Sequence, residues 1–312
     1  MRCLVTGAAG FIASTLAQRL LAAGHDVVGV DGFVDNYPEP LKRANLVDLL
    51  REPRFSFVEG LIETLDIEPL VAQADYVYHL AALPGVRSSW GASFEAYASH
   101  NVYATQRLLE AARRVGVERF AYASSSSVYG DTDLLPMVET GRERPHSPYG
   151  VTKLAGEHLV RLYHRNYGVP TVSLRYFTVY GPRQRPDMAI QRFLTASRDG
   201  TPITLFGDGE QTRDFTYVDD TVDATLRAAQ RGRRGAVYNV GGGSTVTVNH
   251  LIEVIEAVTG SRLEVRREGV QRGDVGHTLA DTQRASEELD CVPSIQLEDG
   301  IARHWEWLRA AD

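Results

Sequence analysis

Short apolar runs alternate with stretches of helical periodicity along the first 180 residues. The apolar runs predict strands that are buried on both faces, and they lie at residues 2–6, 27–30, 55–59, 76–80, 120–123 and 169–175. Between them, Leu, Val and Tyr recur at helical spacing, most clearly over residues 93–115 and 149–167. This alternation predicts an α/β fold that is built on a doubly wound parallel sheet.

The rhythm changes after about residue 180, where Gly-Pro, Arg-Pro, Gly-Thr-Pro and Gly-Asp-Gly breaks crowd together. We therefore expect a larger lobe over residues 1–180 and a smaller C-terminal, substrate-binding lobe over residues 181–312. Residues 214–240 contain a strand-like and a helix-like stretch, and we expect them to return to the larger lobe. A binding site between the two lobes follows from this organisation.

The N-terminal residues form a βαβ pattern in which Gly7 and Gly10 lie between the first strand and a helical stretch. A glycine-rich turn at that place lets a pyrophosphate approach the backbone N–H groups of a helix N-terminus, as in the Rossmann fold. The second strand ends at Asp31, whose carboxylate can accept hydrogen bonds from a ribose diol and would repel a 2′-phosphate. The pattern predicts NAD rather than NADP as the cofactor.

Tyr149 and Lys153 are four residues apart in the second predicted helix, downstream of the serine run 124–127. At that spacing the two side chains lie on one helix face, about 5–6 Å apart at Cβ. The ammonium is expected to lower the pKa of the phenol, and the Ser125 hydroxyl is expected to share the substrate proton. Together the three residues predict a proton-transfer site for a sugar or alcohol hydroxyl.

Composition and charge narrow the class of protein. The chain has 312 residues, 43% of them hydrophobic and 23% charged, with a net charge of −7. The acidic balance argues against nucleic-acid and membrane-surface partners, and no run approaches the roughly 18 apolar residues of a membrane span. The only two cysteines, Cys3 and Cys291, favour a reducing compartment, so we expect a cytoplasmic protein. Neither a metal motif such as H-E-x-x-H nor a G-x-S-x-G elbow is present.

The chain as a whole resembles the extended short-chain dehydrogenase/reductase family, specifically its nucleotide-sugar epimerases and dehydratases. The resemblance covers nearly the full length and rests on motifs that occur in the family's order: Thr6-Gly7-Ala8-Ala9-Gly10-Phe11-Ile12, His79-Leu80-Ala81-Ala82, Asn101, Ser125 with Val128-Tyr129-Gly130, Tyr149-x-x-x-Lys153, Arg175-Tyr176-Phe177 and Arg213-Asp214-Phe215.

The resemblance implies a tightly bound NAD that is recycled within each turnover, and it implies roles for individual residues. Tyr149 would be the acid/base, Lys153 would hold the nicotinamide ribose, and Ser125 would bond the reacting hydroxyl. The residues expected to contact NAD are Gly7, Gly10, Phe11, Ile12, Asp31, Gly32, Asn36, Leu61, Ile62, Leu80, Ala81, Ala82, Asn101, Tyr149, Lys153 and Tyr176. In the smaller lobe, Thr204 and Phe206 would line the uracil of a UDP-sugar, and Arg213, Arg272 and Asp274 would hold its diphosphate and ribose. The resemblance also implies a homodimer, formed by the helices near 93–115 and 149–167.

Two positions depart from the family pattern. Ala13 replaces the third glycine of the turn, a position where close helix–strand packing tolerates a small side chain. Leu61 stands where the family often has an aspartate that bonds the adenine amine. We therefore expect weaker retention of NAD than is usual in the family.

The residues after the catalytic hydroxyl distinguish among the reactions of the family, all of which begin by oxidising the sugar at C4. Dehydratases carry Asp-Glu at the positions of Ser126 and Ser127, and decarboxylases tend to carry a Glu at the position of Ser127. Serine cannot supply a carboxyl group, which disfavours 4,6-dehydration and decarboxylation. The remaining reaction is 4-epimerisation.

The nature of the sugar stays open among three UDP-sugars. Ser126, Ser127, Thr178 and Arg185 are expected near the C5–C6 end, where hydroxyl groups and a guanidinium suit a carboxylate; Arg87 is a further candidate. This favours UDP-glucuronate, with UDP-glucose or UDP-N-acetylglucosamine as alternatives. Two hypotheses from other classes are a NAD-bound regulatory protein, disfavoured by the intact Ser125, Tyr149 and Lys153, and an NADPH-dependent reductase, disfavoured by Asp31.

Overall fold

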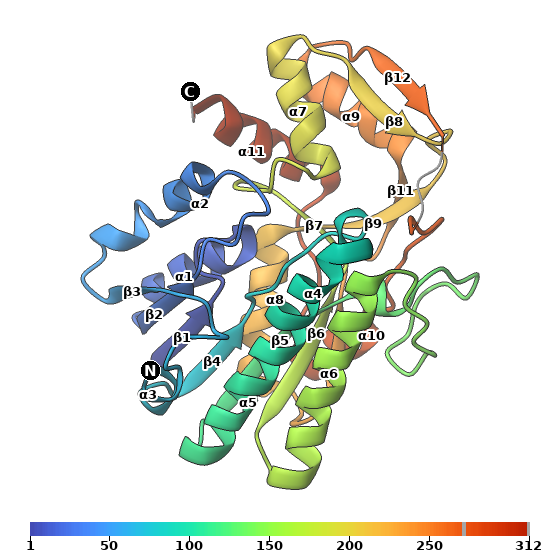
Figure 1. Cartoon of the computed structure of the whole chain (residues 1–312). Helices are drawn as coiled ribbons and strands as arrows, with labels where there is room; N and C mark the ends of the chain where they lie inside the picture. The colour runs from blue at the N-terminus through green and yellow to red at the C-terminus, as the bar shows by residue number, and fades with distance from the viewer. Residues whose placement is uncertain (270–272, 311–312) are drawn as a thin grey trace.

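A seven-stranded parallel sheet forms the centre of the larger lobe (Figure 1). The computed structural model describes residues 1–269 and 273–310. The strand order is β10-β6-β5-β4-β1-β2-β3, and every neighbouring pair is parallel. The strands are β1 (Arg2–Thr6), β2 (Asp26–Asp31), β3 (Phe55–Glu59), β4 (Tyr76–His79), β5 (Arg119–Ser125), β6 (Thr171–Tyr176) and β10 (Val237–Val240).

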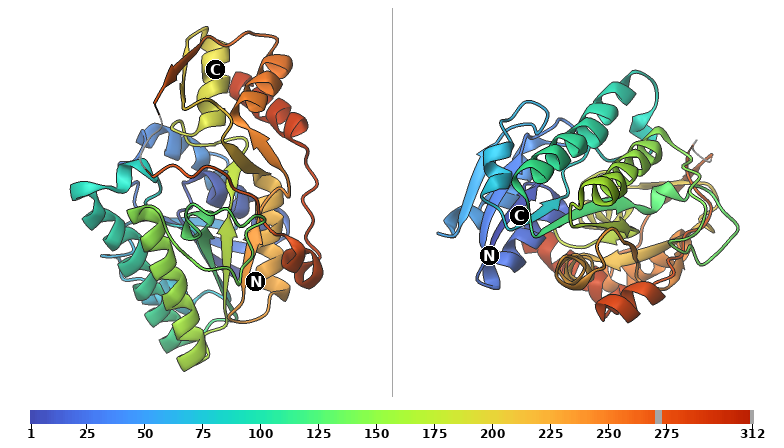
Figure 2. Two further views of the ribbon diagram at one scale, coloured as in Figure 1. Left: turned by 90° about the vertical axis from the view of Figure 1, so that its right-hand side faces the viewer. Right: turned by 90° about the horizontal axis from the view of Figure 1, so that it is seen from below.

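Helices cover both faces of this sheet. On one face α1 (Phe11–Ala22) packs against α8 (Val218–Arg231), which also contacts β5 and β6. On the other face α5 (Ala104–Val115) packs between α3 (Glu68–Ala72) and α6 (Pro148–Tyr167). Figure 2 shows the two layers on opposite sides of the strands. The predicted doubly wound parallel sheet is confirmed. Of the predicted segment 214–240, α8 and β10 lie with the larger lobe, whereas residues 214–217 belong to a separate small sheet.

The boundaries differ from the predicted ones where the local chemistry requires it. Strand β6 begins at Thr171 rather than Val169, because Pro170 has no N–H for the ladder. The helical stretch predicted over 93–115 consists of α4 (Phe94–Tyr97), a π-helical turn η4 (Ala98–Tyr103) and α5. Helix α6 is capped at its N-terminus by Ser147, whose side chain accepts a hydrogen bond from the N–H of Gly150 at 3.1 Å. At its C-terminus it is followed by Gly168 in the left-handed conformation.

The smaller lobe consists of three helices and two small sheets at the carboxyl edge of the large sheet (Figure 1). One sheet has the order β11-β9-β7 and the other pairs β12 with β8. The elements are β7 (Thr178–Tyr180), α7 (Ala189–Asp199), β8 (Ile203–Phe206), β9 (Thr212–Tyr217), β11 (Thr245–Thr247), α9 (Val248–Thr259), β12 (Val265–Glu268) and α11 (Leu297–Ala310).

The remaining elements are short and connect these layers: α2 (Glu39–Leu46), η1 (Leu49–Arg51), η2 (Arg87–Ser89), η3 (Gly91–Ser93), η5 (Ser126–Val128) and α10 (Gln283–Leu289). Cys3 and Cys291, both within the described residues, carry free thiols. Among residues 1–269 and 273–310, none of the helices combines the length and the apolar character that crossing a bilayer requires.

Candidate active site

Two adjoining cavities lie at the carboxyl edge of the sheet. The first runs over the ends of the central strands, and its lining includes Gly7, Gly10 and Ile62. The second lies between the two lobes and is lined by residues as far apart in sequence as Ser88 and Thr278. Ser125, Tyr149 and Arg185 line both cavities, so they mark the place where the two meet.

The glycine-rich turn supplies the conformation that a phosphate-binding loop needs. Gly7 has a φ of 73°, and a Cβ there would lie 2.9 Å from the backbone of Ala81. Its N–H donates to the carbonyl of Val30 at 2.8 Å, which fixes the turn against β2. Helix α1 begins after Gly10, and in the part of the chain that the structure describes no side chain caps it. The first-turn N–H groups of a helix lack intrahelical acceptors, so this end of α1 suits a diphosphate.

Asp31 is held in a fixed orientation at the end of β2. Its carboxylate accepts hydrogen bonds from the N–H groups of Ala9, at 3.0 Å, and Phe33, at 2.8 Å. Burial raises the pKa of Asp31, and these backbone hydrogen bonds act in the opposite direction. Next to it, a Cβ on Gly32 would collide with Leu61, so the leucine fills the space above that glycine.

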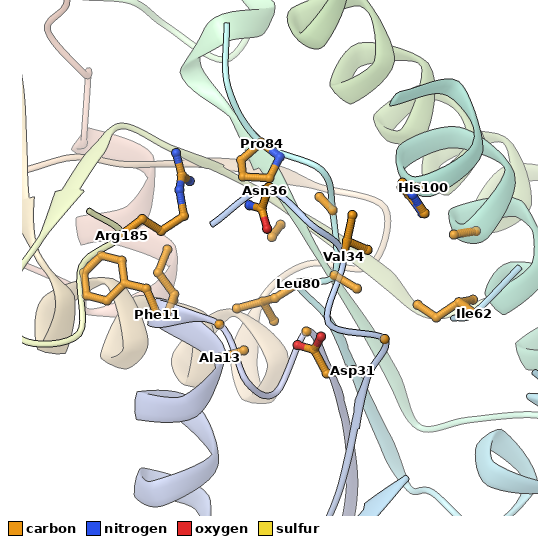
Figure 3. A pocket seen from close by; sticks show the side chains of 18 of the residues that line it. Phe11, Ala13, Asp31, Val34, Asn36, Ile62, Leu80, Pro84, His100 and Arg185 are labelled. Carbon is orange, nitrogen blue, oxygen red and sulfur yellow. The ribbon is translucent and has the colours of Figure 1, made fainter. Parts of the chain in front are cut away.

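Most residues expected at a dinucleotide line the first cavity, and Figure 3 shows several of them. They are Gly7, Gly10, Phe11, Ile12, Asp31, Gly32, Asn36, Leu61, Ile62, Leu80, Ala81, Ala82, Tyr149, Lys153 and Tyr176. The combination of an open turn, a free helix N-terminus and an oriented carboxylate fits a nicotinamide dinucleotide with an unmodified ribose.

Asn101, which the family resemblance placed near the cofactor, is not among the described residues that line this cavity. Its side chain is buried and accepts from the N–H of Leu83 at 2.7 Å. It donates to the carbonyl of Leu83 and to Thr152 Oγ1, both at 3.0 Å. Asn101 therefore ties the loop after β4 to α6 and supports the cavity wall from behind.

The Tyr149 phenol is less acidic than the sequence led us to expect. Burial raises the pKa of Tyr149, while a hydrogen bond with Ser125 and the positive charge of Arg185 lower it by smaller amounts. The groups that lower the pKa of Tyr149 are thus Ser125 and Arg185 rather than Lys153. Burial also lowers the pKa of Lys153, to about 7, with Glu157 acting in the opposite direction. The expected activation of Tyr149 by the Lys153 ammonium is thus offset by the desolvation of both groups.

Lys153 and its surroundings form a buried polar layer beneath Tyr149. The Lys153 ammonium lies 4.6 Å from the centre of the Tyr122 ring. One turn later Glu157, which is fully buried, binds Arg175 at 2.7 Å and accepts from Ser124 Oγ at 2.8 Å. Arg175 thus pairs with Glu157, the carboxylate that acts to raise the pKa of Lys153.

The four residues expected at the sugar all line the second cavity: Ser126, Ser127, Thr178 and Arg185. The guanidinium of Arg185 is oriented by Asp187, which accepts from Nε at 2.9 Å and from Nη2 at 2.8 Å. This bidentate pair fixes the plane of the guanidinium beside Tyr149.

The residues expected at the uridine diphosphate lie at the other side of the second cavity, in the smaller lobe. Thr204, Phe206, Arg213 and Asp274 line it together with Arg87 from the larger lobe. Arg213 donates to the carbonyls of Thr212, at 2.9 Å, and Gly276, at 3.1 Å, which orients its side chain. Arg272, expected at the diphosphate, lies outside the described residues.

Sequence reasoning missed several polar residues that line these cavities: Tyr37, Lys42, Glu63, His100 and Gln211. Lys42 donates to Asn36 Oδ1 at 2.6 Å and lies 4.5 Å from the centre of the Tyr37 ring. Most of the missed residues lie in loops or at helix ends, where no periodicity marks them. Conversely His79, which the sequence left as a buried core histidine, lies between Thr6 and Thr105, and burial lowers its pKa to about 3.

Known proteins are similar to this chain over nearly its whole length. The model of the NAD dependent epimerase/dehydratase family matches residues 3–241. A Bacillus subtilis protein named "Uncharacterized UDP-glucose epimerase YtcB" is 43% identical over 310 residues, covering 99% of this chain and 98% of that protein. A Thermodesulfobacterium geofontis protein named "UDP-glucuronate 4-epimerase" is 36% identical over 308 residues, covering 97% and 95%. The crystal structure of UDP-glucuronic acid 4-epimerase from Bacillus cereus, in complex with UDP-glucuronic acid and NAD, superposes with a TM-score of 0.97 at 42% identity, covering 100% of both chains.

Proposed function

Because the chain belongs to the NAD-dependent epimerase/dehydratase family, we propose that it inverts C4 of a UDP-sugar, with UDP-glucuronate as the substrate. The observation that carries this proposal is that Ser125 and Tyr149 lie where the dinucleotide cavity opens into the cleft between the lobes. Only at that junction can one hydroxyl group be reached by both a cofactor and an acid/base.

The chain's own residues handle the proton of the reaction. When bound, NAD supplies the reversible hydride acceptor for C4. The Tyr149 oxygen takes the proton of the 4-hydroxyl as C4 is oxidised and returns it when C4 is reduced from the other face. Ser125 orients the reacting oxygen, and its own Oγ is positioned by the N–H of Ser127 at 3.1 Å. Lys153, whose pKa burial lowers to about 7, acts as the nearby cation when the phenolate forms.

The composition of the sugar pocket argues for epimerisation over elimination. Elimination removes the C5 proton and the 6-hydroxyl, which requires an added acid and base. Ser126 and Ser127 line the pocket and occupy the positions where dehydratases carry Asp-Glu. A hydroxyl group can orient a substrate, but it cannot serve as a carboxyl acid or base near neutral pH. The 4-keto sugar is therefore expected to rotate in the cleft and be reduced from its other face.

Arg185 supports a uronate as the sugar. Its guanidinium is oriented by Asp187 and stands beside Tyr149, in a pocket that also contains Ser126, Ser127 and Thr178. These donors would hold the substrate carboxylate in the plane of the C4 ketone. The breaking C–C bond of a β-keto acid must align with the carbonyl π system for CO₂ to leave, so this arrangement suppresses decarboxylation. Two relatives named for UDP-glucuronate 4-epimerisation agree with this assignment.

A homodimer and a cytoplasmic location complete the proposal. Helices α5 and α6 lie side by side on the outside of the larger lobe (Figures 1 and 2). The exposed apolar side chains on and beside them include Trp90, Phe94, Tyr103, Val115, Val151, Leu162 and Tyr167. Pairing of this face with a second copy would bury them in a four-helix bundle.

Proton NMR of the purified protein tests the proposed reaction, with NAD added and UDP-glucuronate, UDP-glucose and UDP-N-acetylglucosamine offered separately. We expect a galacto-configured anomeric signal from UDP-glucuronate. Turnover of the neutral sugars alone would retain the 4-epimerase and remove the carboxylate assignment. A pentose or a 4-keto-6-deoxy product would refute epimerisation.

A further inference from the structure

A carboxylate and an imidazole meet at one end of the first cavity, and the proposed reaction uses neither. Glu63 follows β3, and His100 belongs to the π-helical turn η4. Nδ1 of His100 and Oε1 of Glu63 share a hydrogen bond, and both residues line the cavity. Their side chains are only 10% and 19% exposed for Glu63 and His100, so the pair is largely removed from solvent.

The two ends of this cavity have different tasks if the protein binds NAD as proposed. Hydride transfer requires the nicotinamide near Tyr149, and Asp31 is oriented for the other ribose. In Figure 3, His100 and Ile62 lie at one side, Phe11 and Arg185 lie at the other, and Asp31 lies between them. The end that contains Glu63 and His100 is therefore the end that receives the adenine.

The walls at this end suit the faces of a base but not its polar edge. Leu61, Ile62 and Ala104 offer apolar contacts only. The exocyclic amine of adenine is a hydrogen-bond donor, and leaving a buried donor without an acceptor costs about 1–3 kcal/mol. At the position of Leu61 no acceptor is available, because that side chain packs over Gly32. Glu63 brings a carboxylate to the same end of the cavity.

The backbone that carries Glu63 is fixed in place. Arg107 of α5 donates from Nη1 to the carbonyl of Ile62 at 2.6 Å and from Nη2 to that of Leu65 at 3.1 Å. The N–H of Leu65 donates to the carbonyl of Leu61 at 2.8 Å, which closes the turn around Glu63. Burial raises the pKa of Glu63, but the hydrogen bond to His100 and the charges of His100 and Arg107 outweigh burial and lower it overall. The lowered pKa favours the ionised carboxylate, in which both oxygens can only accept hydrogen bonds.

We infer that Glu63, oriented by His100, accepts the hydrogen bond of the adenine amine and makes the cavity selective for adenine. This inference rests on the proposed use of NAD. His100 engages Oε1, so Oε2 is the oxygen that would accept from the amine. Glu63 thus supplies, two residues further along the chain, the acceptor that the Leu61 side chain lacks.

The test compares NAD with nicotinamide hypoxanthine dinucleotide, in which a carbonyl replaces the amine. The full-length chain is equilibrated with both dinucleotides, and the bound fraction of each is measured by chromatography after extraction. Calorimetry on the nucleotide-free chain gives the separate dissociation constants. We expect the unmodified chain to prefer NAD by about tenfold or more, since hydrogen bonds to charged groups contribute about 1.5–3 kcal/mol.

The decisive variant is Glu63→Gln, which keeps the shape and a partner for His100. Its amide can present an oxygen to the adenine amine or an NH₂ group to the hypoxanthine carbonyl, so the preference for NAD should fall close to one as binding of the hypoxanthine dinucleotide improves. Glu68→Gln is the matched control: this carboxylate lies on α3 and binds Arg114 at 2.9 Å, away from the cavity lining. It should leave the preference unchanged.

The possible results distinguish a failure of the Glu63 assignment from a failure of the proposed use of NAD. If Glu63→Gln weakens both dinucleotides by the same factor, the pair is only a structural clamp and the inference fails. If the unmodified chain binds both dinucleotides equally well, the inference fails and the use of NAD stands. If it binds neither, the proposed function fails with it.

Discussion

Arg87 and Asp274 join the two lobes across the mouth of the second cavity. Nε and Nη2 of Arg87 lie 3.2 and 2.6 Å from the two carboxylate oxygens of Asp274. The same guanidinium stacks over the Phe206 ring at 4.3 Å from its centre. From the sequence, Arg87 was a candidate at the sugar, but its partners Phe206 and Asp274 are two of the residues expected at the uridine diphosphate.

Replacing Arg87 should weaken nucleotide binding more than stability. The pair is partly exposed, and such pairs contribute about 0–1 kcal/mol to folding. The guanidinium can instead contact the diphosphate, where a charge-assisted bond has a larger effect. We expect Arg87→Ala to raise the dissociation constant of UDP by about tenfold in calorimetry, with little change in melting temperature. Arg51→Ala removes a remote, more exposed pair with Asp48 and serves as the control; equal UDP affinity in both variants would contradict the prediction.

Removing the Tyr149 oxygen should abolish turnover and leave the fold intact. Phenylalanine preserves the ring and its edge-to-face contact with Tyr97 at 6.3 Å. Without an acid/base, we expect kcat to fall by about 10²–10⁴-fold, whereas calorimetry should show NAD still bound. Tyr167→Phe changes an exposed tyrosine at the end of the same helix and should have no effect on rate. Near-normal activity of Tyr149→Phe would remove its assigned role.

Arg185→Ala should harm a uronate far more than a neutral sugar. We expect kcat/KM for UDP-glucuronate to fall by about ten- to hundredfold, as loss of a charged hydrogen bond implies. Because the charge of Arg185 lowers the pKa of Tyr149, its removal should also shift the rate profile of UDP-glucose to higher pH. Asp187→Asn, which keeps the guanidinium but loosens its orientation, should give a smaller loss. An equal decrease for both sugars would discard the carboxylate assignment.

Lys153 should make stability depend on pH in the alkaline range. Burial lowers its pKa to about 7 from the ordinary value of 10.5, so between these two values the unfolded chain binds the proton more tightly than the folded chain. Stability from this group therefore rises as the pH rises through that window and is lost as the pH falls toward 7. We expect Lys153→Met to melt above the unmodified chain at about pH 7 and this advantage to shrink by about pH 9.5. A difference that does not vary with pH would contradict the predicted shift.

A charge on α6 should separate the proposed dimer. Leu162 is 51% exposed on this helix, and Leu162→Glu would place a carboxylate inside an apolar helix–helix contact. Sedimentation velocity should show a dimer for the unmodified chain and a monomer for this variant. Leu50→Glu is matched, since Leu50 is 59% exposed in the short helix η1, away from α5 and α6. A monomeric unmodified chain would refute the dimer.

The sequence by itself determined the architecture and the placement of Tyr149 and Lys153 on one helix. Apolar runs such as residues 76–80 are buried on both faces, and no other arrangement satisfies both their hydrophobicity and their backbone groups. The turn after the first strand requires Gly7 and Gly10, and Asp31 ends the second strand, so both features can be recognised from a few neighbouring residues. Tyr149 and Lys153 were predictable because a helix fixes the relation between residues four apart.

Tertiary structure alone decided which distant residues meet and how acidic they are. Arg87 reaches Asp274 and Glu63 reaches His100 across loops whose paths leave no periodic trace in the sequence. The pKa of Tyr149 depends on burial, which removes water from Tyr149 and Lys153 together and so reverses the expectation from spacing alone. Local geometry is carried by neighbouring residues, whereas desolvation and long-range pairing arise only when the whole chain is packed.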